Sequence, residues 1–230
     1  MNLPLTEAFF LFISTPSKNY EASEVKFLPS WMDIQLDFHA SCGVITDLYL
    51  NGMISIVNGN VKYTENEISN IDYINDAIQA IKNDPEKSLP YWINYFSSID
   101  YPKKQKVRFQ IIDKINDHLE KEGLLTVKKS KYLLFFNSVI TNSTEKGDNA
   151  KSEIIERLRK SISSGTISEY DLLLSLLLSD KYTDVLKSYL SPSEDELINK
   201  MLDAELFNGP NLKLRTIAES YIQGWNFRTP

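Results

Sequence analysis

Apolar residues recur at every third or fourth position over most of the chain, which is the spacing of helices that bury one face. The clearest case is 33–50, where the apolar stripe ends at Asn51-Gly52, a typical helix stop. The same spacing predicts further helices at 71–81, 89–99, 107–119, 154–162 and 170–180. The leucine-dense stretch 170–180 is apolar on several faces, so we expect it to be a buried central helix.

Two shorter regions have the pattern of β-hairpins. In "MISIVNGNVKYT", two strand-like runs flank Asn58-Gly59-Asn60, where the glycine supplies a positive φ angle. Farther along, "LLTV" and "YLLFFNSVI" are predicted to be the arms of a second hairpin, with its turn at 128–131. The polar stretch "TNSTEKGDN" that follows is predicted to be a loop.

The sequence near both ends of the chain is also consistent with a mainly helical fold. Ser191, Pro192 and Glu194 combine an N-cap, a proline at the first helical position and a capping-box glutamate, so a helix is predicted to begin there. The apolar run near the N-terminus follows Glu7 and has no preceding basic residue, which favours mature structure over a signal peptide. No repeat or linker divides the chain. The prediction is a mainly α fold, with one helical domain over 1–230, a central buried helix bundle and two small β-hairpins.

Composition narrows the functional class. The 230 residues are 42% hydrophobic and 24% charged, and no apolar run approaches the roughly 18 residues of a membrane span. A net charge of −6 argues against nucleic-acid binding, which needs clustered basic side chains. The single cysteine, Cys42, excludes an internal disulfide and indicates a reducing, cytoplasmic setting.

The sequence offers little evidence of catalysis. His39 and Cys42 have the spacing of a nucleophile and its base, but Cys42 lies on the apolar stripe, where a cysteine is typically a small core residue. His118 stands beside Asp117 and Glu120 and is predicted to lie on a solvated helix face. No phosphate-binding loop, nucleophile elbow or metalloprotease helix occurs. We therefore predict no enzyme, no cofactor and no metal site.

Two residues are harder to explain as ordinary structure. Trp31 follows a proline-containing loop and precedes a predicted helix, a position suited to capping a core or to lying at a membrane interface. Arg108 falls on the apolar stripe of its helix, where a guanidinium must extend to solvent or meet an anion. The stretch "EKEGLLTVKKSKYLLFF" has the pattern of a winged-helix wing, which leaves DNA binding as a distant third interpretation.

The order of the motifs resembles the Golgi phosphoprotein 3 family. The matching segments are "LPLTEAFFLFI", "DLYLNGMISI", "NDAIQAIKNDPEKSLPYWINYFS", "DKINDHLEKEGLLTVKKSKYLLFF", "EIIERLRKSI" and "YDLLLSLLLSDKYTDVL". They cover most of the chain in the order of the family. The segment from the long helix through "EGLL" into the hairpin is the most specific, and it identifies the wing-like stretch as this family's β-hairpin.

The resemblance implies a mainly helical, non-catalytic peripheral membrane protein. Eukaryotic members bind phosphatidylinositol 4-phosphate on Golgi membranes and sort glycosyltransferases through their cytoplasmic tails, and the hairpin contributes to self-association. Trp31 falls close to the family's membrane-side tryptophan. The positions of the three arginines that hold the phosphate in the family fall on Ser41, Phe109 and Ile112, so all three cations are missing here.

The chain offers other residues for the same task. We predict a headgroup site made of Trp31, Arg108, Lys104 and Lys106, with an anionic phospholipid, phosphatidylinositol 4-phosphate, as its ligand. Protein partners are also expected. The chain lacks the long basic N-terminal arm of eukaryotic members and is compact, as prokaryotic relatives are, which makes Golgi coat and enzyme tails weaker candidates.

The apolar residues of the second hairpin predict a homo-oligomer, because a two-stranded ribbon has difficulty burying both faces alone. These residues are Leu133, Leu134, Phe135 and Phe136. The resulting hypothesis is a cytoplasmic adaptor that lies peripherally at a membrane surface. The alternative is a soluble helical scaffold for protein interactions that has kept the fold and lost the lipid site.

Overall fold

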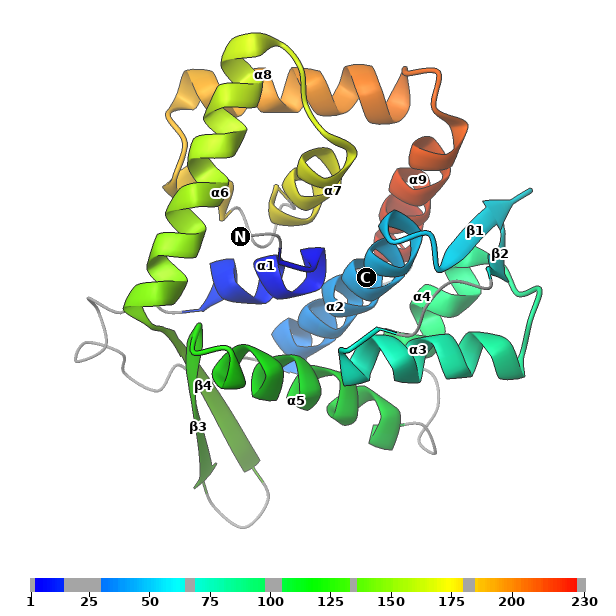
Figure 1. The fold of residues 1–230 in the computed structure, drawn as a ribbon, viewed down its shortest axis with the longest axis vertical. Coiled ribbons are helices and arrows are strands. Elements are labelled where there is room, and N and C mark those ends of the chain that lie inside the picture. Colours follow the sequence, from blue (N-terminus) through cyan, green and yellow to red (C-terminus); the bar gives the residue numbers. More distant parts are fainter. Residues whose placement is uncertain are drawn as a thin grey trace.

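A ring of helices surrounds one short central helix in the computed structural model (Figure 1). The structure describes residues 3–14, 30–64, 69–97, 105–132, 136–179 and 185–226. The α-helices are α1 (Leu5–Ile13), α2 (Ser30–Leu50), α3 (Asp72–Asn83), α4 (Leu89–Ser97), α5 (Gln105–Lys121), α6 (Glu145–Ser164), α7 (Glu169–Leu178), α8 (Pro192–Leu202) and α9 (Leu212–Asn226). Two antiparallel pairs, β1 (Ile54–Val57) with β2 (Asn60–Tyr63) and β3 (Leu125–Tyr132) with β4 (Phe136–Ser143), complete the fold. A short 3-10 helix, η3 (Leu186–Ser188), and a π-helix, η4 (Asp203–Phe207), flank α8. The mainly α prediction is confirmed.

The central helix is α1. Its residues from Leu5 to Phe12 are all buried, and it packs against α2, α5, α6 and α7 (Figure 1). A helix that is apolar on nearly every face cannot lie at a surface, and each fully buried large apolar side chain contributes about 1.5–3 kcal/mol. The predicted central helix, α7, lies beside it with Leu173, Leu174 and Leu178 fully buried. The N-terminal apolar run is therefore the middle of the core.

A glycine allows α1 to cross α2 closely. A Cβ atom on Gly43 would lie 2.8 Å from Thr6 Oγ1 and 3.1 Å from Thr6 Cα. These separations are too short for a side chain, so the two helices approach each other at the one α2 position that has none. One turn farther along α2, Asp47 reaches the start of α1.

The first hairpin agrees with the prediction. Val57 pairs with Asn60, and the two residues between them, Asn58 and Gly59, have φ angles of 52° and 77°. Two consecutive positive φ angles are the mark of the tight turn that matches the right-handed twist of paired strands. The Asn-Gly pair thus forms the turn that its residue types favour.

The second hairpin exists, but its predicted turn is wrong. Lys128 pairs with Ile140 and Lys131 with Asn137, so the basic stretch 128–131 belongs to β3 and the turn lies beyond Tyr132. The prediction took the polar residues 128–131 as the sign of a turn. The hairpin projects from the body (Figure 1), and antiparallel strands with a solvated face commonly carry polar residues. The register is fixed by the pairing of Leu125 with Ser143 at the base.

The polar loop predicted at 141–149 is also wrong. The strand β4 continues to Ser143, and Thr144 then caps α6 by accepting a hydrogen bond from Gly147 N at 3.1 Å. The capping box predicted at Ser191 is confirmed, with Glu194 Oε2 accepting from Ser191 N at 2.7 Å. In the described ranges, no helix is both long and apolar enough to cross a membrane.

Candidate functional site

The predicted headgroup residues lie at the starts of two helices. Trp31 stands in the first turn of α2, which begins at Ser30, so it is inside the helix and not in the loop before it. Lys106 and Arg108 stand in the first turn of α5. The side chains of these three residues, and all of Lys104, lie outside the part of the chain that the structure describes.

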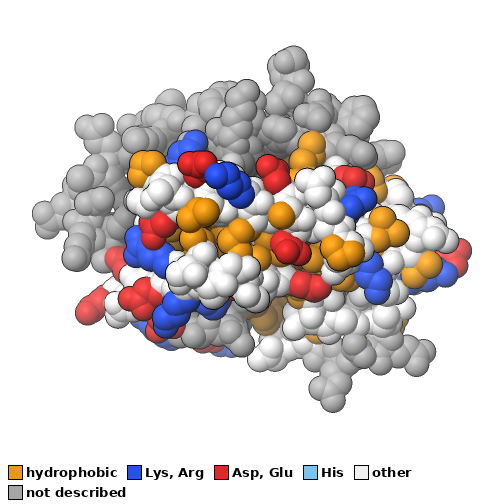
Figure 2. Space-filling view, turned by 90° about the horizontal axis from the view of Figure 1, so that it is seen from above, with side chains coloured by type: hydrophobic (Ala, Val, Ile, Leu, Met, Phe, Trp, Pro, Cys, Tyr) orange, Lys and Arg blue, Asp and Glu red, His pale blue; other side chains and the backbone are white. Residues whose placement is uncertain are grey.

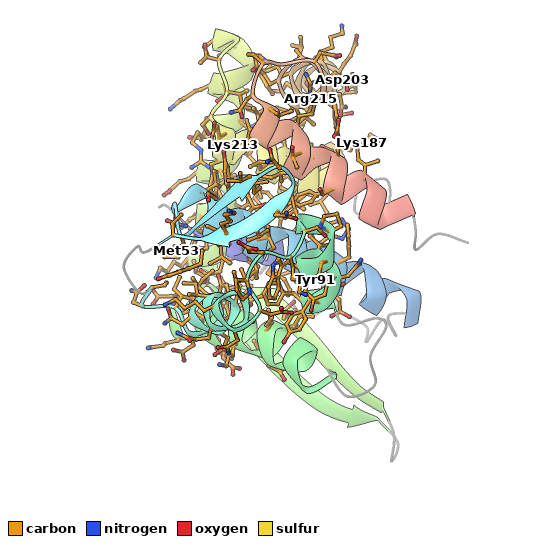
Figure 3. All side chains as sticks on the ribbon, turned by 90° about the vertical axis from the view of Figure 1, so that its right-hand side faces the viewer. Met53, Tyr91, Lys187, Asp203, Lys213 and Arg215 are labelled. Atoms are coloured by element: carbon orange, nitrogen blue, oxygen red, sulfur yellow. The ribbon has the colours of Figure 1, made fainter. Side chains whose placement is uncertain are left out.

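The two helices and the second hairpin are neighbouring elements, since α5 contacts both α2 and β3. The N-terminal end of α2, the helix α5 and the β3–β4 hairpin share the lower part of the molecule in Figure 1, and Figure 3 shows α2 and the hairpin extending toward the same side. The helix α5 leads into the hairpin through Gly123, whose φ angle is 69°. The predicted oligomerisation residues Leu133, Leu134 and Phe135 lie outside the described residues, as does the side chain of Phe136 at the start of β4.

Two of the positions predicted to correspond to the family's arginines have described side chains. Ser41 is 2% exposed, and its hydroxyl donates to the Asp37 carbonyl oxygen at 2.7 Å. Ile112 is half-buried and packs against the hydrophobic core. These two side chains serve the interior of the bundle and offer no positive charge to a phosphate. The side chain of Phe109 lies outside the described residues.

A buried carboxyl group on α1 forms the most unusual polar cluster in the described residues. Glu7 is 1% exposed, and its Oε1 atom accepts a hydrogen bond from Tyr73 Oη at 3.1 Å and lies 2.8 Å from His118 Nδ1. Burial raises the pKa of the Glu7 carboxyl to about 7, the hydrogen bond from Tyr73 opposes this, and the negative charges of Asp47 and Glu122 add to it. The cluster joins α1, α3 and α5 through one side chain.

A second buried carboxyl group caps the same helix. Asp47 Oδ1 accepts from Leu5 N at 2.5 Å, while Oδ2 accepts from Thr6 N at 3.0 Å and from the Thr6 hydroxyl at 2.6 Å. Burial raises the pKa of Asp47 to about 6, and the three hydrogen bonds from Thr6 and Leu5 limit the rise. Asp47 thus satisfies N–H groups at the start of α1 that have no partner within the helix.

Both histidines of the chain are largely buried, although His118 was predicted to lie at the surface. His39 is 2% exposed and stacks on Phe9 with ring centroids 5.2 Å apart, and Cys42 is fully buried, in agreement with a core role for Cys42. The prediction that His118 lies on a solvated face is wrong, because its side chain is only 23% exposed and faces Glu7. Glu7 is a single acid inside the apolar run "LTEAFFLFI", and this was the available signal that a buried polar contact exists.

An open apolar pocket lies elsewhere in the bundle. Its volume is about 250 Å³, and it is lined by residues of α2, α7, α8, η4 and α9, among them Phe38, Leu177, Leu202, Phe207 and Ile222. None of the described residues that line this pocket is a lysine or an arginine, and a phosphate site needs such cations. Figure 2 shows basic and acidic side chains interspersed on the upper face of the molecule, without a region of one sign.

One comparison with known proteins gave a match. A family model described as Golgi phosphoprotein 3 (GPP34) matches residues 35–206, which is more than half of the chain. The matched stretch begins in α2 and ends in η4, so it contains α5 and both hairpins and leaves out α1. No curated protein matches the chain.

Proposed function

Because the chain belongs to the Golgi phosphoprotein 3 family, we propose that it is a non-enzymatic peripheral adaptor that binds an anionic phospholipid surface. The observation that carries this proposal is that the N-terminal end of α2 and the projecting β3–β4 hairpin extend toward the same side of the molecule (Figure 3), while α5 starts at its end away from the hairpin (Figure 1). These helix starts contain Trp31, Lys106 and Arg108. An aromatic ring and two cations suit the interface between a bilayer and water.

The headgroup contact is expected to be weak. A monophosphate must lose part of its hydration on binding, and each charge-assisted hydrogen bond returns only about 1.5–3 kcal/mol. Ser41 and Ile112 supply no charge, so the cations available are those on α5 and just before it. The positive end of the α5 dipole adds a smaller attraction for an anion. Binding to phosphatidylinositol 4-phosphate should therefore depend strongly on salt.

Substitutions at the helix starts test the proposed residues. Arg108→Ala should lower the affinity for vesicles that contain phosphatidylinositol 4-phosphate about tenfold, because it removes one charge-assisted contact. Trp31→Ala should reduce binding to all anionic vesicles. Flotation measures both effects. Lys213→Ala is the matched control, since it removes the same charge from an exposed position that Figure 3 places in the upper part of the molecule, and it should bind as the unmodified protein does.

Self-association through the hairpin is a second part of the proposal. The stretch "YLLFF" spans the β3–β4 turn, since Tyr132 pairs with Phe136. Apolar and aromatic residues in the segment that joins the two strands of a projecting ribbon would favour contact with a second copy. At high micromolar concentration, light scattering should give a mass above the monomer, and Leu134→Glu should restore the monomer. Thr126→Glu, at an exposed position in the same ribbon, should leave the mass unchanged; a monomer in all three samples would refute the idea.

A scaffold for protein interactions without lipid binding is the second candidate. The burial of Ser41 and the packing of Ile112 support it, because both were predicted to stand where the family has phosphate-binding arginines. The side chain of Arg108 separates the two functions. A position of this side chain beside Trp31 would support the lipid-binding function. An ion pair between Arg108 and a nearby carboxylate would support the scaffold function.

A further inference from the structure

The contact between α1 and α5 passes through a group that can lose a proton. Glu7 on α1 lies 2.8 Å from His118 Nδ1, at the end of α5, and the same oxygen accepts from Tyr73 on α3. His118 is 23% exposed while Glu7 is 1% exposed, so the imidazole connects the buried carboxyl group to solvent. A proton can therefore enter and leave the pair without unfolding of the bundle.

The surroundings of the pair carry mostly negative charge. Asp47 on α2 and Glu122, just after α5, both act on Glu7 as like charges, and Tyr73 on α3 stays protonated because burial raises its pKa well above the ordinary value. Tyr170 on α7 also faces this region: burial and the charge of Asp47 raise the pKa of Tyr170, which in turn helps to raise the pKa of Tyr73. The buried cation at the other end of α1, Lys151 on α6, lies near the Ser14 carbonyl oxygen, with its Nζ 3.4 Å away.

We propose that Glu7 and His118 form a proton-dependent latch that holds α5 against α1. With one proton between them, the pair is neutral overall and the two groups attract each other. When that proton is lost, a carboxylate remains in the interior beside Asp47 and Glu122, and both burial and like charge oppose it. The latch therefore closes at mildly acidic to neutral pH and weakens as the pH rises.

The pKa shift of Glu7 on folding determines how the stability of the protein changes with pH. Burial raises the pKa of Glu7 to about 7 in the folded protein, above its ordinary value of 4.5. A carboxyl group whose pKa is raised on folding stabilises the fold fully below the unfolded value and loses this contribution as pH rises through the folded value. The relevant window is therefore between pH 4.5 and slightly above 7. Asp47, with its pKa raised from 3.8 to about 6, contributes in the same direction over a lower range.

The latch holds α5, the helix that carries two residues of the proposed headgroup site. The helix α5 carries Lys106 and Arg108 in its first turn and His118 in its last, and β3 follows it after Gly123. Ile111, Ile115 and Leu119 remain buried in either state, so the expected change is a local loosening of α5 and not its release. The latch concerns the packing of α5 on α1 and is independent of whether any lipid binds.

Hydrogen exchange on the full chain tests the latch. Between pH 5.5 and 8, after correction for intrinsic exchange rates, the protection of α5 amides should fall on the order of tenfold or more. In Glu7→Gln, which keeps the shape and cannot ionise, the loss should be at most about fourfold, the factor by which Asp47 changes the stability of the whole fold over the same range. An equal loss of protection in both proteins would overturn the proposal.

A carboxyl titration gives a second, direct reading. The ¹³C resonance of the Glu7 carboxyl should titrate near neutral pH in the unmodified protein. Glu122→Gln removes an exposed like charge without touching the pair, so it should shift the Glu7 midpoint and the loss of protection together to lower pH. A Glu7 titration at its ordinary acidic value in the folded protein would also overturn the latch. These readings remain available if Glu7→Gln fails to fold.

Discussion

Replacement of Asp47 by alanine should lower the free energy of unfolding at pH 7 by about 3–5 kcal/mol. The substitution removes both carboxylate oxygens and leaves three donors without partners, namely Leu5 N, Thr6 N and the Thr6 hydroxyl. All three are buried at the start of α1, where water cannot replace the lost acceptor. Urea denaturation followed by circular dichroism measures the change.

Two further variants separate the hydrogen bonds from a general effect of removing an aspartate. Asp47→Asn keeps the size and one acceptor oxygen, so it should cost less, about 1–2 kcal/mol. Asp203→Ala changes an exposed aspartate that Figure 3 places at the upper end of the molecule, and it should change stability by less than about 0.5 kcal/mol. If Asp47→Ala were as mild as Asp203→Ala, α1 would not be held as described.

Gly147→Ala should destabilise the protein by about 3 kcal/mol, although alanine normally stabilises a helix relative to glycine by about 1 kcal/mol. A Cβ atom at this position would overlap the Leu124 carbonyl oxygen and lie 2.5 Å from Ser143 Oγ. The Leu124 carbonyl cannot move freely, because it accepts a hydrogen bond from Thr144 N at 3.0 Å. The first turn of α6 therefore packs on the base of the hairpin only with glycine at 147.

A neighbouring substitution on the same helix provides the control for Gly147. Asn149 is exposed on α6, and Asn149→Ala should be neutral or stabilising by a few tenths of a kcal/mol. The two midpoints in urea give the comparison. A Gly147→Ala protein as stable as Asn149→Ala would show that α6 and the hairpin base are farther apart than the structure places them.

Local patterns predicted most of the fold. The helices α3, α7 and α8 follow from apolar periodicity and capping residues, and the first hairpin follows from Asn58-Gly59, because these signals act within a few residues. The second hairpin was placed correctly but its turn was not. Strand register is determined by cross-strand pairing, here of Lys128 with Ile140, which polarity alone does not reveal.

The polar contacts inside the bundle were not predictable from local sequence. Tyr73 reaches Glu7 across 66 positions of the chain and Asp47 reaches Thr6 across 41, so each partner is determined by how the helices pack. The role of Gly43 is equally non-local, because it depends on the path of α1 across α2. Carboxylates on amphipathic helices usually lie at the surface, and this general expectation was wrong for Glu7 and Asp47.

Vesicle flotation of the unmodified protein tests the lipid adaptor proposal most directly. Vesicles with phosphatidylinositol 4-phosphate, vesicles with another anionic lipid at equal charge, and neutral vesicles are compared at low and moderate salt. We expect weak binding to both anionic vesicles, lost at moderate salt and absent from neutral vesicles, because the attraction between the α5 cations and anionic lipid is screened by salt. Absence of binding to every vesicle at low salt would contradict the adaptor proposal and favour the scaffold. Tight, headgroup-specific binding at moderate salt that persists in Arg108→Ala would show that the headgroup is held somewhere other than the starts of α2 and α5.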